Sequence, residues 1–375
     1  MAFYTLLNGY VGSKAPYVSK IKALFDKKCK RYVEPFCGGA ALFFSNCNSR
    51  YEEEWINDAN PNIACLYKVL VDEETRGVTV DMLLEIDKPD NKDEAKRQFN
   101  EVSKKLLRTN PRHIPLDKRT EIAKNAFLCY SQSFNCAAKS YSSQKSNQKY
   151  KFEVKRNLMN ALERLKTKPR VTHEDGIDVI LSVKDDPETQ LYVDWPYVGL
   201  YRNESKLYAN EMASLYAHIE GAIALRDSKA AVVMSDYRAR EGIPTIYDAI
   251  LTGKEWHCYK VADTYKHCIV VENGEHKQKA SEYVWTNRVP ENAGIYISLH
   301  DYKEKITFKE YWDKIIEAAV EGKLVADEIL EYEYTFNRIF KGKPLFAERI
   351  IEEAVRSGKN KKLRKEVQKS RQDKK

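Results

Sequence analysis

The chain has 375 residues, 43% of them hydrophobic and 31% charged, and its formal net charge is +8. This balance is typical of a soluble globular protein that can bury a sizeable core. No apolar run approaches the roughly 18 residues that span a bilayer, and the N-terminus lacks the features of a signal peptide, so we expect a cytoplasmic protein.

Strands and helices alternate in the first part of the chain. Residues 31–34 have the pattern of a short strand that ends at Pro35, and a Gly-rich turn then leads into a helix. A second strand ends at Asp58, and a helix follows from about Pro61 to Leu70. This order favours an α/β fold with a parallel sheet covered by helices.

The alternation stops between about Val80 and Leu165, where the chain is polar, charged and mostly helical in pattern. Beyond this segment we expect further strands, a hairpin and a final strand, at residues 170–173, 191–194, 230–235, 259–261 with 268–271, and 281–287. We therefore predict an α/β domain, an insert and a helical appendage with a basic tail, formed by residues 1–80 with 165–300, by residues 81–164 and by residues 301–375 respectively.

The positive charge lies at the C-terminal end. Residues 356–375 contain ten Lys and Arg against two acidic residues, whereas the other 355 residues carry 53 charges of each sign. Such a tail is typical of a solvated, poorly ordered end, although it could also contact nucleic-acid phosphates. The eight cysteines show neither C-x-x-C pairs nor zinc-ligand spacing, so we expect free thiols and no metal site.

A Gly-rich turn, Phe36-Cys37-Gly38-Gly39, follows the first strand. Such a turn lets a ligand approach the backbone, and the next helix N-terminus favours an anionic group. Asp58 closes the second strand, 20 residues after Gly38, where a carboxylate could bind ribose hydroxyls. The segment indicates either a nucleoside-type ligand or an ordinary turn.

The tetrapeptide Asp194-Trp195-Pro196-Tyr197 ends an apolar strand. A carboxylate and a neighbouring backbone carbonyl can accept hydrogen bonds from the amino group of a flat base. The tyrosine ring can stack on that base, a contact worth roughly 1–3 kcal/mol. A turn capped by an aspartate is the alternative interpretation of these four residues taken alone.

Four segments, taken together, resemble a known family. Residues 10–14, 33–39, 58–60 and 194–197 are similar to the ordered motifs of Dam-type, D-P-P-Y-containing DNA adenine-N6 methyltransferases, and the resemblance covers about residues 4 to 300. It implies a Rossmann-like methyltransferase sheet, a mostly helical target-recognition insert, S-adenosylmethionine as cofactor and double-stranded DNA as partner. It also suggests a bacterial or phage-infected cell and a restriction-modification context.

The resemblance implies roles for individual residues. The catalytic residues would be Asp194, Trp195, Pro196 and Tyr197. The cofactor-binding residues would be Tyr10, Lys14, Glu34, Phe36, Gly38, Asp58 and Asp175. A later strand end, Ser235-Asp236-Tyr237, would help to shape the site.

Two positions depart from the family pattern. Trp195 stands where the family has its first proline, so the backbone carbonyl is kept but the indole needs room, against the target base or the cofactor. Ala40 replaces the last glycine of the loop, a mild change if its φ is negative.

The target base can be narrowed further. No proline is followed by cysteine, as a cytosine-C5 nucleophile would need, and cytosine-N4 enzymes usually have serine in place of Asp194. We therefore predict a site-specific adenine-N6 enzyme that flips its target out of duplex DNA and needs no metal. The alternatives are a cofactor- or DNA-binding protein with little catalysis, in which Trp195 blocks the pocket, and an RNA adenine methyltransferase.

The insert is expected to read the target sequence. Residues 137–156 contain six basic residues and one acid, with aromatic and amide side chains that can reach base edges and phosphates. The candidate DNA contacts are Lys139, Tyr141, Ser142, Gln144, Lys145, Asn147 and Lys149. A mobile polar loop is the alternative interpretation of this segment.

Overall fold

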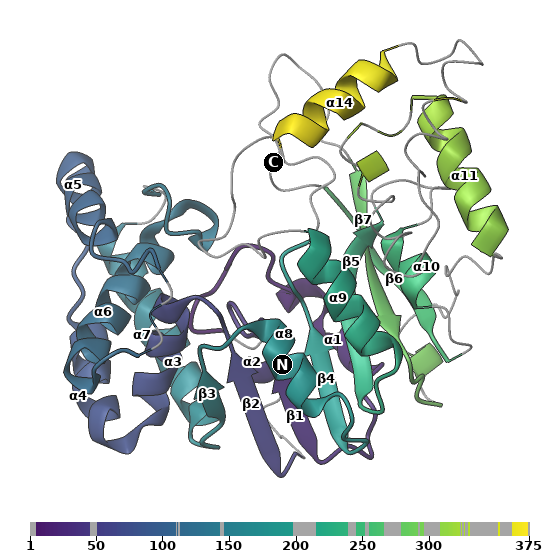
Figure 1. The fold of residues 1–375 in the computed structure, drawn as a ribbon. Coiled ribbons are helices and arrows are strands. Elements are labelled where there is room, and N and C mark those ends of the chain that lie inside the picture. The colour runs from purple at the N-terminus through teal and green to yellow at the C-terminus, as the bar shows by residue number, and fades with distance from the viewer. Residues whose placement is uncertain are drawn as a thin grey trace.

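The structure is a computed structural model of the chain. It describes residues 5–45, 51–109, 111, 113–142, 146–197, 215–238, 245–251, 255–265, 279–291, 293–295, 308–322, 324, 326, 329–330, 352 and 362–373. Within these residues seven strands form one sheet in the order β3-β2-β1-β4-β5-β7-β6 (Figure 1).

The strands from β3 to β5 run parallel, whereas β7 is antiparallel to both of its neighbours. Their bounds are Arg31–Glu34 (β1), Glu53–Asn57 (β2), Arg170–Thr172 (β3), Thr189–Val193 (β4), Ala231–Arg238 (β5), His257–Tyr265 (β6) and Lys279–Thr286 (β7). The predicted α/β class is confirmed, and the strand order agrees with the Rossmann-like sheet that the resemblance implies.

Apolar residues on both faces of the parallel strands explain why the sheet is covered on two sides. Neighbouring residues such as Tyr32 and Val33 are both buried, and they belong to two separate core clusters. One face carries α1 (Val18–Lys22), α2 (Ala41–Phe44) and α3 (Pro61–Val71), and the other carries α8 (Gly176–Val183), α9 (Leu215–Arg226) and α10 (Ile246–Ile250) (Figure 1).

The segment between β2 and β3 is helical, as predicted from its pattern. After α3 it contains α4 (Glu73–Leu84), α5 (Lys92–Ser103), α6 (Leu116–Gln132) and α7 (Asn147–Leu165). Side chains of Asp72, Asn91 and Ser146 accept hydrogen bonds from backbone N–H groups in the first turns of α4, α5 and α7. Such caps fix where these helices begin.

Helix α7 is fastened to the sheet by a buried ion pair. The guanidinium of Arg164 contacts the carboxylate of Glu54 on β2, and both side chains are almost fully buried. The same guanidinium donates to the Phe43 carbonyl oxygen at 3.0 Å and to Thr167 Oγ1 at 2.7 Å. These bonds join the end of the insert to β2 and α2.

One half of the predicted hairpin is described. Residues 259–261 belong to β6, which pairs with β7, with Tyr259 opposite Val284. Residues 268–271 lie outside the described residues. Residues 281–286 of the predicted final strand belong to β7, which ends one residue earlier than predicted.

Two helices are described in the C-terminal region, α11 (Phe308–Val320) and α14 (Leu363–Asp373). Leu363 and Val367 of α14 are fully buried and belong to the core cluster that contains α8 and α9. The expectation of a poorly ordered basic tail is therefore wrong for residues 363–373, because two apolar side chains dock this helix on the protein.

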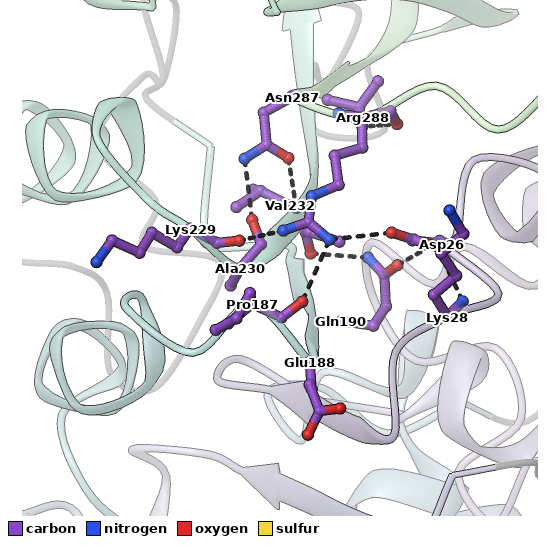
Figure 2. A network of polar contacts seen from close by, with 12 residues as sticks. Asp26, Lys28, Pro187, Glu188, Gln190, Lys229, Ala230, Val232, Asn287 and Arg288 are labelled. Carbon is purple, nitrogen blue, oxygen red and sulfur yellow. Dashed lines mark hydrogen bonds and ion pairs between the residues drawn. The ribbon is translucent and has the colours of Figure 1, made fainter.

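A polar network ties the amino ends of β4 and β5 to the chain on either side (Figure 2). Arg288 donates to Asp26 Oδ2 at 2.9 Å and to the Lys229 carbonyl oxygen, and the backbone N–H of Asp26 donates to Gln190 Oε1 at 2.7 Å. Asn287 bonds the backbone of Ala230 and of Val232 on β5. The network therefore lies at the ends of these strands that are opposite to the candidate site.

This network predicts a pH-dependent part of the folding stability. Burial raises the pKa of Asp26, but the Lys28 N–H and the Arg288 guanidinium outweigh it and lower that pKa below its ordinary value. A lowered pKa stabilises the fold above about pH 4, and this contribution is lost as the pH falls. We expect Asp26→Asn to flatten the decline of the urea-unfolding free energy below pH 4, whereas Asp185→Asn, at an exposed aspartate, should not. Equal slopes in both variants would contradict this.

Candidate active site

The predicted site residues lie at the carboxyl ends of β1 and β4, which are neighbours in the sheet. Helix α2, which follows β1, lies on one face of the sheet, whereas α9, which follows β4, lies on the other. A crevice at such a switch point is the usual ligand site of an open α/β sheet. Glu34 ends β1, and Asp194 directly follows β4.

Lys14 is the centre of a charged cluster at this point. Its Nζ atom lies 2.9 Å from Asp194 Oδ1 and 3.8 Å from Glu282 Oε1, and it is 4.8 Å from the ring centroid of Tyr197. The phenol of Tyr197 donates to Glu282 Oε1 at 2.5 Å. The structure thus brings together an N-terminal lysine, both ends of the Asp194–Tyr197 tetrapeptide and a residue of β7.

Burial sets the protonation of the carboxyl groups here. It raises the pKa of Asp194, and the Lys14 ammonium partly offsets this effect. Burial raises the pKa of Glu282 to about 7 and that of Glu34 to about 8, with the Tyr32 phenol donating to Glu34 at 2.7 Å. The side chain of Asp194 is 19% exposed, whereas that of Glu282 is only 2% exposed.

The Gly-rich turn packs against Tyr10. Gly38 has a φ of +46°, and a Cβ atom there would come within 2.7 Å of the Tyr10 ring, so glycine is required on both conformational and steric grounds. The Gly38 N–H donates to Asp58 Oδ2 at 2.8 Å, and the Asn60 N–H donates to Asp58 Oδ1 at 2.8 Å. Burial raises the pKa of Asp58 to about 6.

Ala40 does not have the negative φ that would make its replacement of glycine a mild change. Its φ is +51°, in the left-handed region, so this alanine takes a backbone conformation that the family's glycine adopts more easily. The left-handed conformation costs an L-residue roughly 1–2 kcal/mol. Ala40 nevertheless occupies the N-cap position of α2, so the Gly-rich turn leads into this helix as predicted.

Phe36 and Asp175 lie beside the start of α8. The Phe36 ring covers Gly176, where an added Cβ would come within 2.3 Å of the ring. Asp175 is exposed and caps α8 by accepting the Ile177 N–H at 2.8 Å. The ring and the helix start therefore form one wall beside the ends of β1 and β3.

The indole of Trp195 lies in the hydrophobic core, with 1% of its surface exposed. It stacks on Tyr247 of α10 and makes an edge contact with His218 of α9, and its Nε1–H donates to the Tyr247 hydroxyl at 3.2 Å. A Cβ at Gly221 would come within 2.7 Å of the indole, so α9 approaches it closely. This packing accommodates the side chain under α9 and gives no support to a tryptophan that blocks the pocket.

Helix α6 of the insert reaches the Gly-rich turn. The Asn60 side chain donates to the Tyr130 hydroxyl at 2.7 Å, and the rings of Tyr130 and Tyr10 are 5.7 Å apart. Asn60 also caps α3, next to Asp58. The last turn of α6 is thus part of the wall around the predicted cofactor loop.

The candidate DNA contacts that the structure describes are of two kinds, exposed lysines and residues whose side chain or backbone is already bonded within the insert. Lys139 and Lys149 are exposed. Tyr141 pairs with Ser133 in an isolated β-bridge, and the Asn147 amide donates to Asp87 at 2.8 Å. The backbone N–H of Ser142 donates to the Gln132 carbonyl oxygen. Gln144 and Lys145 lie outside the described residues.

Glu282 is the site residue that the sequence interpretation missed. It sits within the segment predicted as the last strand, and an acidic side chain next to the apolar residues 283–285 was the only available signal. Ser235 and Asp236 lie on β5, where the Ser235 hydroxyl is 3.0 Å from that of Tyr192. Pro196 continues the chain between Trp195 and Tyr197 and is partly buried.

Comparisons with known proteins bear on this arrangement. A model of the family described as D12 class N6 adenine-specific DNA methyltransferase matches residues 10–267. No curated protein matches the chain. Among the described residues, no group of three or more His, Cys, Asp or Glu could hold a metal ion, and no described helix could cross a membrane.

Proposed function

The chain belongs to the D12 class of N6 adenine-specific DNA methyltransferases, and from this we propose that Asp194 and Tyr197 form its catalytic centre. The family makes the chain an enzyme that methylates the N6 amine of adenine in DNA. The observation that carries the residue assignment is the cluster of Lys14, Asp194 and Tyr197 at the junction of β1 and β4.

The proposed mechanism is one of positioning. S-adenosylmethionine, when bound, supplies an electrophilic methyl group. The Asp194 carboxylate and the Trp195 carbonyl accept hydrogen bonds from the adenine amine and would turn its lone pair toward the methyl group to be transferred. The Tyr197 ring stacks on the base, which leaves the duplex at a cost of a few kcal/mol.

The cofactor fits the residues beside this centre. The Asp58 carboxylate is held by two backbone N–H groups and is partly accessible, so it can accept hydrogen bonds from ribose hydroxyls. Gly38 has no side chain of its own beside the Tyr10 ring, and Tyr10 and Phe36 offer aromatic faces. We assign cofactor contacts to these four residues together with Lys14, Glu34 and Asp175.

We expect Gly176→Ala to weaken cofactor binding about tenfold, because overpacking of a buried site costs about 1–3 kcal/mol and the Phe36 ring would have to move. Isothermal titration with S-adenosylmethionine measures this. Gly77→Ala is the matched control, since an added Cβ there meets nothing within 4 Å and should stabilise helix α4 by about 0.5–1 kcal/mol. Unchanged affinity in Gly176→Ala would remove Phe36 from the cofactor wall.

The insert and the phosphates of DNA form the second part of the proposal. Exposed Lys139 and Lys149 can contact phosphates, whereas Tyr141 and Asn147 hold the surrounding backbone in place. We propose residues 81–164 as the target-recognition insert, residues 1–80 and 165–300 as the catalytic domain and residues 301–375 as a helical appendage.

Expression in a host free of adenine methylation tests the function. We expect N6-methyladenine in the host DNA, and sequencing of the modified positions would give the recognition sequence. Duplex DNA should be a better substrate than RNA of the same sequence. A protein that binds S-adenosylmethionine but leaves host DNA and oligonucleotide pools unmodified would contradict the proposal.

A further inference from the structure

Glu282 is a buried carboxylate that the reaction described above does not use. It lies on β7, opposite Tyr237 of β5 and Ala262 of β6, and only 2% of its side chain is exposed. A buried carboxylate costs free energy unless it is paired, and an apolar residue usually serves stability as well or better. Its place in the strand therefore calls for a role beyond packing.

Glu282 contacts two members of the charged cluster around Lys14. Its Oε1 atom accepts the Tyr197 phenol at 2.5 Å, and Lys14 Nζ lies 3.8 Å from the same oxygen. Lys14 is at the same time 2.9 Å from Asp194 Oδ1. One ammonium thus lies between two carboxylates, and it is nearer to the catalytic one.

This arrangement answers a difficulty of the proposed mechanism. The adenine amine must donate to the Asp194 carboxylate, which already accepts a hydrogen bond from Lys14 in this structure. Lys14 Nζ also donates to the Gly12 carbonyl oxygen at 2.8 Å, but a buried ammonium that loses its carboxylate partner is destabilised. A second carboxylate within 4 Å allows Lys14 to change from one carboxylate partner to another.

We propose that Glu282 is a positioning residue for methyl transfer, which holds the Tyr197 ring through its phenol and takes the Lys14 ammonium when Asp194 binds the adenine amine. The proposal rests on the proposed function. The charged and titratable groups that face Glu282 are Lys14, Asp194, Tyr197 and Asp236. Burial raises the pKa of Glu282 to about 7, so about half of this group is charged at pH 7 and more of it at higher pH.

Two substitutions separate the parts of this role. Glu282→Gln keeps an oxygen that can accept the Tyr197 phenol but removes the charge that receives Lys14. Glu282→Leu removes both. We expect the single-turnover methylation rate to fall about tenfold in the first variant and about 100-fold in the second, with little change in the KM for DNA.

A second measurement needs no cofactor and reports only on the position of the Tyr197 ring. In a duplex with 2-aminopurine at the target adenine, stacking on Tyr197 should quench the fluorescence of the flipped base in the wild-type protein and in Glu282→Gln. The quenching should be weaker in Glu282→Leu. Tyr197→Phe combined with Glu282→Leu should show non-additive losses, because both remove the same hydrogen bond.

Glu54→Gln is the matched control, since Glu54 is another buried strand glutamate paired with a cation, away from this cluster. It should lower stability but leave the rate per folded molecule unchanged. Rates of both Glu282 variants within about twofold of wild type, or losses that follow the folded fraction as in Glu54→Gln, would overturn the proposal. A wild-type protein that does not methylate adenine would instead overturn the proposed function, and the positioning role with it.

Discussion

Asp194→Ala should reduce adenine methylation by about 1,000-fold or more, the largest effect of any single change in this chain. The substitution removes the acceptor for the target amine and leaves the Lys14 ammonium with Glu282, 3.8 Å away, as its remaining carboxylate in the cluster. Single-turnover assays on the recognition sequence measure the loss, and digestion of host DNA by a methylation-sensitive nuclease provides a check in cells.

Asp194→Asn keeps one acceptor oxygen for the amine but removes the charge that pairs with Lys14. Its methylation rate should therefore lie between those of the wild type and the alanine variant. Asp185→Ala, at an exposed aspartate ahead of β4, should leave the rate unchanged. If Asp194→Ala kept more than about a tenth of the wild-type rate, Asp194 could not be the residue that orients the amine.

The largest effect on stability is expected at Arg164. Arg164→Ala leaves the carboxylate of Glu54 buried without its cation and breaks the bonds to Phe43 and Thr167. Removing one partner of a buried ion pair costs about 3–5 kcal/mol. Urea unfolding followed by circular dichroism measures the change in free energy.

Lys166→Ala serves as the control at the same helix end. Lys166 and Glu163 form an exposed ion pair, which contributes about 0.5 kcal/mol or less. A double variant, Glu54→Leu with Arg164→Met, should recover much of the loss because no buried charge remains unpaired. Equal costs for Arg164→Ala and Lys166→Ala would show that the buried pair does not hold the insert.

The parallel part of the sheet could be predicted because its strands are short apolar runs with clear ends. Pro35 follows β1, and Asp58 follows β2 with a helix-starting proline at position 61. The pairing of β6 with β7 could not be predicted in the same way. Several short apolar segments compete there, and hydropathy alone does not decide which two become neighbours.

Within the site, residues named by local motifs were predictable and residues brought in by topology were not. Lys14 and Asp194 belong to motifs, and the structure places them 2.9 Å apart. Glu282 joins them only because β7 lies between β5 and β6. The position of the Trp195 indole depends on α9 and α10, which follow it in the chain, so the tetrapeptide itself held no information about it.

Tyr130 connects the insert to the Gly-rich turn. It belongs to α6 of the insert, yet it accepts a hydrogen bond from Asn60, next to the carboxylate of Asp58 that we propose for ribose binding, and it packs near Tyr10 beside the Gly-rich turn. We therefore expect any shift of α6 on DNA binding to move the proposed cofactor loop as well. Thermodynamic reciprocity then requires that the factor by which DNA changes cofactor affinity equals the factor by which the cofactor changes DNA affinity.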